Sequence, residues 1–216
     1  MNESASLPLA PRAGPRPLRL GDAAPNFRAR ATTGEVNLQN FRGRWLIFFS
    51  HPADFTPVCT SEFLGLAKAA DEFSARGCAL LGLSIDSLYA HLAWVRAIRE
   101  LFGVLIPFPI IEDPSMAIGR AYGMIDEDAT DSASVRATYF IDPAGMIRAI
   151  SWYPMQVGRS VDEMLRLLTA LQRTEAQDVL TPADWQPGQD LLLPPMQAQG
   201  EPLAAPDWFY RLRPDK

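Results

Sequence analysis

The decapeptide HPADFTPVCT, residues 51–60, follows the hydrophobic run WLIFFS at residues 45–50. Aromatic and branched apolar side chains dominate that run, which predicts a buried strand. From Cys59 onward, apolar residues recur every three or four positions, which predicts a helix over residues 59–76. The loop therefore places Cys59 at or just inside a helix N-terminus, where free backbone N–H groups and the helix dipole stabilise a thiolate. The stretch combines a strand-to-helix connection with a candidate nucleophile.

The segments around this loop predict an open α/β sheet. Short edge segments at 21–27 and 35–38 flank a turn at Thr33-Gly34. The apolar run at 79–85 suits a central parallel strand, and Asp86 or Ser87 can cap a following helix. Strand, helix, strand and helix therefore follow one another in the first half of the chain.

The second half of the chain changes to antiparallel pairing. A strand at 108–111 and a short helix at 116–122 come before two strands, 137–141 and 146–152, which the turn sequence DPAG joins. The sequence SVDE, starting at Ser160, has the capping-box pattern and opens a further helix. This order predicts an α/β protein with a thioredoxin-like fold, a central mixed β-sheet flanked by helices. Open sheets of this kind bind ligands at the carboxyl ends of their strands.

Composition divides the chain into three parts. Residues 1–17 are rich in proline and arginine and predict a mobile N-terminal arm. Residues 18–175 form the predicted thioredoxin-like domain, and residues 176–216 a C-terminal extension. The extension is rich in proline and carries Trp185 and Trp208, so we expect a largely irregular segment that packs on its own domain or on a partner subunit. Exposed aromatic residues there favour the partner subunit.

Charge and hydropathy exclude several classes of function. The net charge of -5 and the pI of about 5.1 argue against broad binding to nucleic acid or to an anionic membrane surface. No apolar run approaches the roughly 18 to 20 residues that a membrane-spanning helix needs. With 216 residues, 48% of them hydrophobic, the chain can bury a substantial core.

The chain has two cysteines, Cys59 and Cys78, and two histidines, His51 and His91. Two cysteines are too few for a disulfide scaffold, so the simplest expectation is a reducing, cytoplasmic setting. The four residues lack the paired short spacings of a zinc site. We therefore expect no structural metal and no cofactor.

Thr56 limits the thiol chemistry of the loop. In thioredoxin-type exchange, a C-x-x-C pair places a second, resolving cysteine at the position that Thr56 occupies here. A hydroxyl at that position donates or accepts a hydrogen bond but resolves no disulfide. A peroxide suits such a site, because Cys59 would become a sulfenic acid while the departing oxygen needs stabilisation as negative charge grows on it.

These residues carry a family resemblance. Pro52-x-x-x-Thr56-x-x-Cys59 resembles the peroxiredoxin signature, and residues 51–60 together resemble the one-cysteine, peroxiredoxin-6-like group. The likeness extends over about residues 18–213 and includes the segments LSIDS, HLAW, PFPII and TPADW. It implies a thioredoxin-like fold and a thiol-dependent peroxidase that reduces hydrogen peroxide and organic hydroperoxides to water and alcohols.

The resemblance also implies roles for single residues. Cys59 resembles the peroxidatic nucleophile, Thr56 the hydroxyl that bonds the peroxide, and Pro52 the ring that shields the sulfur from water. Arg136 resembles the guanidinium beside the thiolate. A permanent cation in that place favours the thiolate and stabilises the charge that develops in the transition state.

Three further residues resemble supporting members of the family site. Glu62 and Arg159 resemble the pair that holds Arg136 in place, with an ordinary surface ion pair as the alternative. His51 resembles a histidine near the sulfur. A lone histidine is as often structural, so both an acid–base role and a structural role stay open for it.

Cys78 does not suit the role of a resolving cysteine. It opens a predicted strand at the far end of the helix that Cys59 begins, and a helix of roughly 17 residues is about 25 Å long. The sulfenic acid would then need an external thiol or other small reductant, for example glutathione or thioredoxin. Family likeness and the C-terminal extension also imply a homodimer or a higher oligomer.

Two other classes of function remain as alternatives. A redox sensor or thiol oxidoreductase would use the same Cys59 chemistry but pass the oxidation to a partner protein. Turnover with a small thiol distinguishes an enzyme from such a sensor. A non-catalytic holdase would use the aromatic tail instead, and its function would persist after Cys59→Ala.

Overall fold

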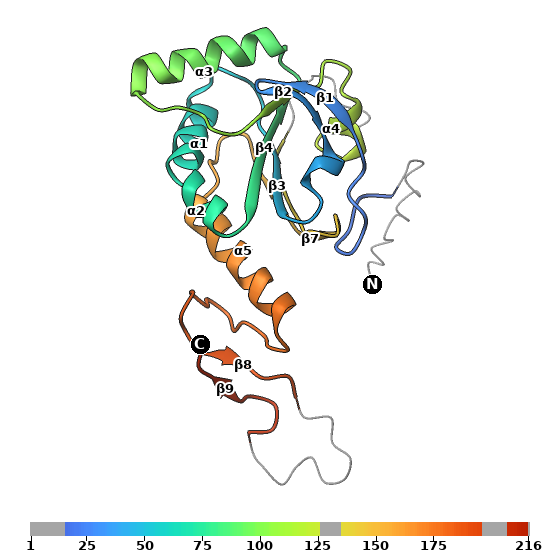
Figure 1. Ribbon diagram of the computed structural model, residues 1–216, viewed down its shortest axis with the longest axis vertical. Helices are drawn as coiled ribbons and strands as arrows, with labels where there is room; N and C mark the ends of the chain where they lie inside the picture. Colours follow the sequence, from blue (N-terminus) through green and yellow to red (C-terminus); the bar gives the residue numbers. More distant parts are fainter. Residues whose placement is uncertain (1–15, 126–134, 196–206, 216) are drawn as a thin grey trace, which may run out of the picture.

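The computed structural model describes residues 16–125, 135–195 and 207–215, and its centre is a seven-stranded mixed sheet with the order β2-β1-β5-β4-β3-β6-β7 (Figure 1). The strands are β1 (Arg28–Ala31), β2 (Gly34–Asn37), β3 (Trp45–Ser50), β4 (Cys78–Ser84), β5 (Ile110–Glu112), β6 (Arg136–Ile141) and β7 (Ile147–Tyr153). The helices are η1 (Leu38–Phe41), α1 (Pro57–Lys68), α2 (Ala70–Ala75), α3 (Leu88–Phe102), α4 (Ala117–Ala121) and α5 (Val161–Ala176). The predicted α/β, thioredoxin-like class is confirmed.

Strand β3 lies in the middle of the sheet and is buried along its whole length. It runs parallel to β4 and antiparallel to β6. Its alternate side chains face opposite layers: Phe49 packs with residues of α1, α2, α3 and α5, whereas Phe48 packs with Phe27 and Tyr122. Figure 1 shows α1, α2 and α5 on one side of the sheet and α4 on the other. Two apolar layers therefore fix the strand from which the reactive loop leaves.

The predicted turn and helix starts form as their residue types require. Gly145 adopts a positive φ of 76° in the turn between β6 and β7, where Asp142 accepts the Met146 N–H at 2.8 Å. Ser160 caps α5 by accepting the Glu163 N–H at 3.2 Å. Ser87, one of the two predicted caps, begins α3 in the same way.

The single helix predicted over residues 59–76 is wrong in its extent. Helix α1 begins at Pro57, whose missing N–H costs nothing in the first turn, and it ends at Lys68. The chain leaves helical geometry at the core residue Ala69, with ψ near 1°, before α2 begins. The surrounding alanines contain no helix breaker, so nothing in the local sequence indicates this interruption.

The first predicted edge segment also lies elsewhere. Strand β1 occupies residues 28–31 rather than 21–27, and it pairs with β2 and β5. The earlier stretch contributes one isolated bridge, between Ala23 and Met146. Around this bridge the Gly21 N–H donates to the Ile147 carbonyl at 2.8 Å, the Ile147 N–H to the Asp22 carbonyl at 2.9 Å and the Ala24 N–H to the Gly145 carbonyl at 3.0 Å. The pairing ends before Pro25, which has no backbone N–H to donate.

The C-terminal extension packs on its own chain more than its aromatic composition indicated. Trp185 is fully buried in a cluster with Ala170 of α5, Val179 and Leu191. Short strands β8 (Leu191–Leu192) and β9 (Leu212–Arg213) pair with each other, so this part is not wholly irregular. The division at residues 17 and 175 stays a prediction, and residues 1–15 and 196–206 lie outside the described residues.

Candidate active site

The loop of residues 51–56, called here the reactive loop, leaves the carboxyl end of β3 and delivers Cys59 as the third residue of α1. Thr56 stands immediately before the helix in extended conformation, and its carbonyl accepts the Thr60 N–H at 2.9 Å. Its hydroxyl donates to the Ala53 carbonyl at 2.9 Å, which keeps the oxygen lone pairs available as acceptors. Cys59 therefore lies in the first turn of the helix, as predicted, and its side chain is fully buried.

Arg136, at the start of β6, is the basic residue that reaches the sulfur. Its Nη1 donates to the Cys59 Sγ at 3.3 Å and to Glu62 Oε2 at 2.8 Å. Its Nε and Nη2 both donate to the Met155 carbonyl, at 2.9 and 2.7 Å. Because the planar guanidinium is held at both ends, one N–H points at the sulfur in a fixed direction. Two residues 77 positions apart thus meet at the candidate nucleophile.

Glu62 lies one turn after Cys59 and joins two buried arginines. Besides Arg136, it accepts hydrogen bonds from Arg159 through Nε at 2.9 Å, Nη2 at 2.8 Å and the backbone N–H at 2.8 Å. The side chains of all three residues are 3% exposed, so the alternative of an ordinary surface ion pair is wrong. Arg159 also donates to the Ala137 carbonyl at 2.9 Å, which ties the pair to β6.

The environment of Glu62 keeps its carboxylate ionised. Burial by itself raises the pKa of a carboxylic acid, because it penalises the charged form. Here the hydrogen bonds and positive charge of Arg159, together with the charge of Arg136, outweigh burial and hold the pKa of Glu62 below its ordinary value. The buried site therefore contains one anion between two permanent cations.

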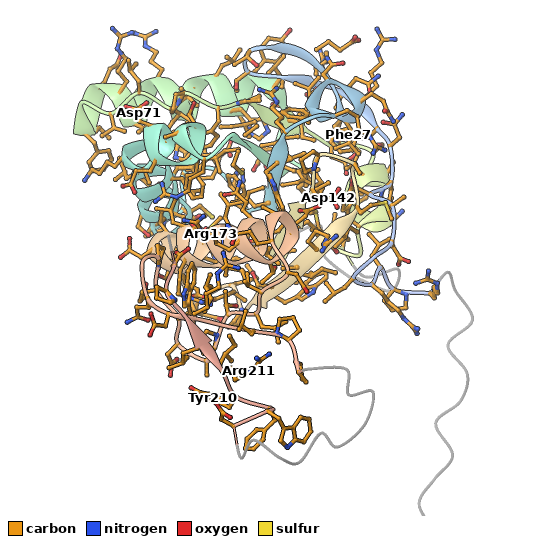
Figure 2. The ribbon with its side chains drawn as sticks, turned by 60° about the horizontal axis from the view of Figure 1, so that its bottom comes forward. Phe27, Asp71, Asp142, Arg173, Tyr210 and Arg211 are labelled. Carbon is orange, nitrogen blue, oxygen red and sulfur yellow. The ribbon has the colours of Figure 1, made fainter. Side chains whose placement is uncertain are left out.

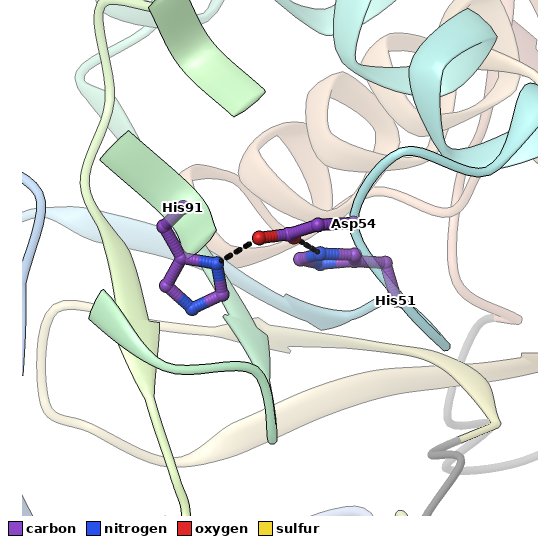
Figure 3. Close-up of side chains that lie close together, drawn as sticks. All are labelled: His51, Asp54 and His91. Carbon is purple, nitrogen blue, oxygen red and sulfur yellow. Dashed lines mark hydrogen bonds and ion pairs between the residues drawn. The ribbon is translucent and has the colours of Figure 1, made fainter. Parts of the chain in front are cut away.

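A second polar cluster joins the reactive loop to α3. Asp54 accepts a hydrogen bond from His51 Nε2 at 2.8 Å and another from His91 Nδ1 at 2.7 Å (Figure 3). One potential ligand atom from each of these three residues lies within 4.8 Å of the other two, an arrangement that could hold a metal ion. One nitrogen of each imidazole donates to the carboxylate, so hydrogen bonds already join the three residues. The other ring nitrogen of His91, Nε2, is buried and has no hydrogen-bond partner among the described residues.

Figure 2 shows the ribbon with the side chains of the described residues drawn as sticks. The structure separates the predicted site residues into three groups. Cys59, Arg136, Glu62 and Arg159 form one connected network of hydrogen bonds. Pro52, which is buried, and Thr56, which is half-buried, lie on the loop that leads to Cys59. His51 lies in the adjoining cluster, packed edge-on against Phe63 at a ring distance of 4.8 Å.

The sequence interpretation missed three members of this region, namely Asp54, His91 and the Met155 carbonyl. The spacing His51-x-x-Asp54 gave a signal for one short-range hydrogen bond. His91 lies 37 positions from Asp54, so only the packing of α3 over the loop brings them together. A backbone carbonyl has no residue type that marks it in a sequence.

Cys78 lies far from this network. Its pairing with Trp45 places it at the start of β3, whereas Cys59 follows the end of that strand. A six-residue strand spans about 16 to 20 Å, well beyond the roughly 7 Å that a disulfide allows between Cα atoms. Burial raises the pKa of the Cys78 thiol to about 12, which makes it a poor nucleophile at neutral pH.

The sequence matches two family models and many known peroxiredoxins. Residues 20–150 match the model of the AhpC/TSA family, and residues 170–201 match that of the C-terminal domain of 1-Cys peroxiredoxin. A peroxiredoxin of Aquifex aeolicus is 49% identical over 170 residues, covering 78% of this chain and 77% of that protein. A peroxiredoxin of Methanosarcina mazei is 42% identical over 213 residues, covering 91% and 97%.

Solved structures agree with the sequence matches. A yeast mitochondrial 1-Cys peroxiredoxin, studied for its thiol resolving mechanism via glutathione/thioredoxin systems, superposes with a TM-score of 0.81 at 36% identity. The match covers 92% of this chain and all of that one. A cysteine-to-serine mutant of peroxiredoxin 6 of Arenicola marina gives a TM-score of 0.78 at 35% identity, covering 84% and 86%. The chain therefore belongs to the AhpC/TSA family of peroxiredoxins, which are thiol-dependent peroxidases built on a thioredoxin-like fold.

Proposed function

We propose that this peroxiredoxin reduces hydrogen peroxide and organic hydroperoxides by a one-cysteine mechanism centred on Cys59. The observation that carries the proposal is the 3.3 Å contact from Arg136 Nη1 to the Cys59 Sγ at a helix N-terminus. The thiolate sulfur attacks one peroxide oxygen, the O–O bond breaks, and Cys59 becomes a sulfenic acid. The other oxygen leaves as hydroxide or alkoxide and takes up a proton to give water or alcohol.

In this proposal the neighbouring residues bind the peroxide, stabilise the departing oxygen and keep Arg136 in position. Thr56 offers its hydroxyl oxygen to the peroxide, and Arg136 donates to the oxygen on which charge grows. Pro52 excludes water from the sulfur, while Glu62 and Arg159 fix the direction of the Arg136 guanidinium.

The sulfenic acid is reduced by an external thiol. A first thiol forms a mixed disulfide with Cys59 and releases water. A second thiol then attacks the external sulfur of that disulfide, so that the Cys59 thiol is released and the two external sulfurs leave joined as a disulfide. Support comes from the free state and remote position of Cys78. We propose glutathione or thioredoxin as the reductant, a homodimer as the assembly, and the cytoplasm as the location. None of the helices in the described ranges is long and apolar enough to cross a membrane.

Mass spectrometry of stoichiometrically oxidised protein tests this function. One equivalent of peroxide should add one oxygen to Cys59, and excess peroxide should add a second and a third. A Cys78→Ala variant should behave identically, and many equivalents of peroxide should be consumed once a small thiol is supplied. A rapid, quantitative Cys59–Cys78 disulfide would overturn the one-cysteine mechanism, and oxidation without turnover would favour the redox sensor.

A further inference from the structure

The cluster of His51, Asp54 and His91, called here the His–Asp–His cluster, has no assigned part in the proposed reaction. His51 and Asp54 both lie in the reactive loop, and His91 lies in α3. Figure 3 shows the Asp54 carboxylate between the two imidazole rings. The side chains are 0%, 2% and 0% exposed, so solvent does not compete for their hydrogen bonds.

Asp54 is held through its side chain and its backbone. Each carboxylate oxygen accepts from one imidazole, and the backbone N–H donates to Asp86 Oδ2 at 2.9 Å. Asp86 accepts in turn from Ser84 Oγ at 2.9 Å, at the end of β4. The middle of the reactive loop is therefore tied to the end of β4 and to α3. A buried carboxylate that loses one of these donors is left with an unsatisfied charge.

The residue after Asp54 shows that the loop needs such restraint. Phe55 has a φ of +58°, a region that bulky L residues rarely adopt and that persists only where the surroundings impose it. Its side chain is 59% exposed, so its own packing is not the main restraint. The hydrogen bonds of Asp54, directly before it, and of the Thr56 hydroxyl to Ala53, directly after it, hold this conformation.

The same cluster contacts the helix that carries Cys59. The His51 ring packs against Phe63, one turn after Cys59, and against Trp94 of α3 at a ring distance of 5.2 Å. Trp94 Nε1 donates to the hydroxyl of Thr60, the residue next to Cys59, at 3.3 Å. Movement of the cluster would therefore disturb the first turn of α1.

We propose that Asp54 and His91 are positioning residues that keep the reactive loop closed, so that Cys59 stays buried beside Arg136. The inference rests on the proposed function of Cys59. In the closed loop the sulfur is in contact with the guanidinium and reacts with a small peroxide. In an open loop that contact is lost while larger reagents gain access. Loss of the cluster should thus change the two reactivities of Cys59 in opposite directions, because each follows the population of one state.

Two rates measured on the same variants test this proposal: Cys59 oxidation by hydrogen peroxide, and Cys59 labelling by a bulky maleimide without peroxide. Asp54→Asn and His91→Leu should slow oxidation about 10- to 100-fold and speed labelling about 10-fold, as expected for loss of a buried charge-assisted hydrogen bond. His91→Asn keeps an N–H donor near the position of Nδ1 and should recover part of both effects. Asp113→Asn is the matched control, because Asp113 is 2% exposed and holds Gly119 instead.

Cys78 serves as an internal reporter of unfolding, because it is buried in β4. Its labelling should stay slow in every variant. If Asp54→Asn exposes Cys78, that variant unfolds and does not report on the loop. The comparison of His91→Leu with His91→Asn then tests whether the cluster keeps the loop closed. The proposal is overturned if both Cys59 rates stay within about twofold of wild type, if both move in the same direction, or if Cys78 and Cys59 become reactive together in all three cluster variants. The proposed function fails separately, if wild-type Cys59 forms no sulfenic acid.

Discussion

Replacing Glu62 by glutamine tests how much its buried ion pairs contribute to the free energy of unfolding. The change keeps the shape of the side chain but removes the negative charge between Arg136 and Arg159. The new amide N–H₂ also faces guanidinium donors where an acceptor stood before. Both arginines would stay buried without their anionic partner, so we expect a large loss of stability.

The size of the expected loss of stability follows from the burial of Glu62. Removing one partner of a buried ion pair costs about 3 to 5 kcal/mol, whereas an exposed pair contributes about 0 to 1 kcal/mol. Glu62 is 3% exposed, and Glu163, paired with Arg166 on α5, is 48% exposed. Glu163→Gln is therefore the matched control: the same chemical change should cost less than about 1 kcal/mol there.

The pH dependence gives a second check, with its sign fixed by the lowered pKa of Glu62. A carboxylate with a depressed pKa in the folded state contributes stability that is fully present above its ordinary pKa, about 4.3, and is lost as the pH falls through the folded value. The difference in free energy of unfolding between wild type and Glu62→Gln should be largest at neutral pH and shrink on acidification below that ordinary value. Urea denaturation across the pH range measures it. A difference below about 1 kcal/mol at pH 7, or one that grows in acid, would refute the reasoning.

Three more predictions concern single residues. Arg136→Lys keeps the charge but loses the planar fork, so the rate of Cys59 oxidation should fall about 10- to 1,000-fold in stopped-flow measurements, and an unchanged rate would remove Arg136 from the site. Cys78→Ala should leave peroxide turnover intact while lowering the free energy of unfolding by about 1 kcal/mol, and a loss of turnover in a folded variant would contradict the one-cysteine mechanism. Gly145→Ala places a Cβ at a positive φ, and the Arg42 guanidinium that it would meet is the end of a flexible side chain that can move aside, so backbone strain should set the cost, about 1 kcal/mol in thermal denaturation. Gly188→Ala, also at positive φ but with open space around it, should cost about the same, and a much larger loss at Gly145 would show that Arg42 cannot move.

Local sequence patterns predicted the elements whose causes are local. The all-apolar run of β3, the turn before Gly145 and the cap at Ser160 each depend on residues within a few positions of one another. The break at Ala69 could not be predicted in this way, because no glycine or proline stands at it.

Some residues of the candidate site could be predicted from the local sequence, some only from family resemblance, and some not at all. The position of Cys59 followed from the strand-to-helix pattern, whereas Arg136 required family resemblance, since 77 positions separate it from the sulfur. Glu62 was assigned with Arg159 by the same resemblance, and only the structure shows that the pair is buried. The Asp54–His91 hydrogen bond depends on where α3 crosses the loop, which is a tertiary fact.

The group formed by Glu62, Arg136, Arg159 and Cys59 has a simple charge inventory. Two guanidinium groups and one carboxylate leave one positive charge, and a Cys59 thiolate cancels it. The sulfenic acid that the proposed reaction produces is neutral, so oxidation leaves this buried group with a net charge of +1. In the proposed reaction, each oxidation or reduction of Cys59 would therefore change the net charge of this buried group by one unit.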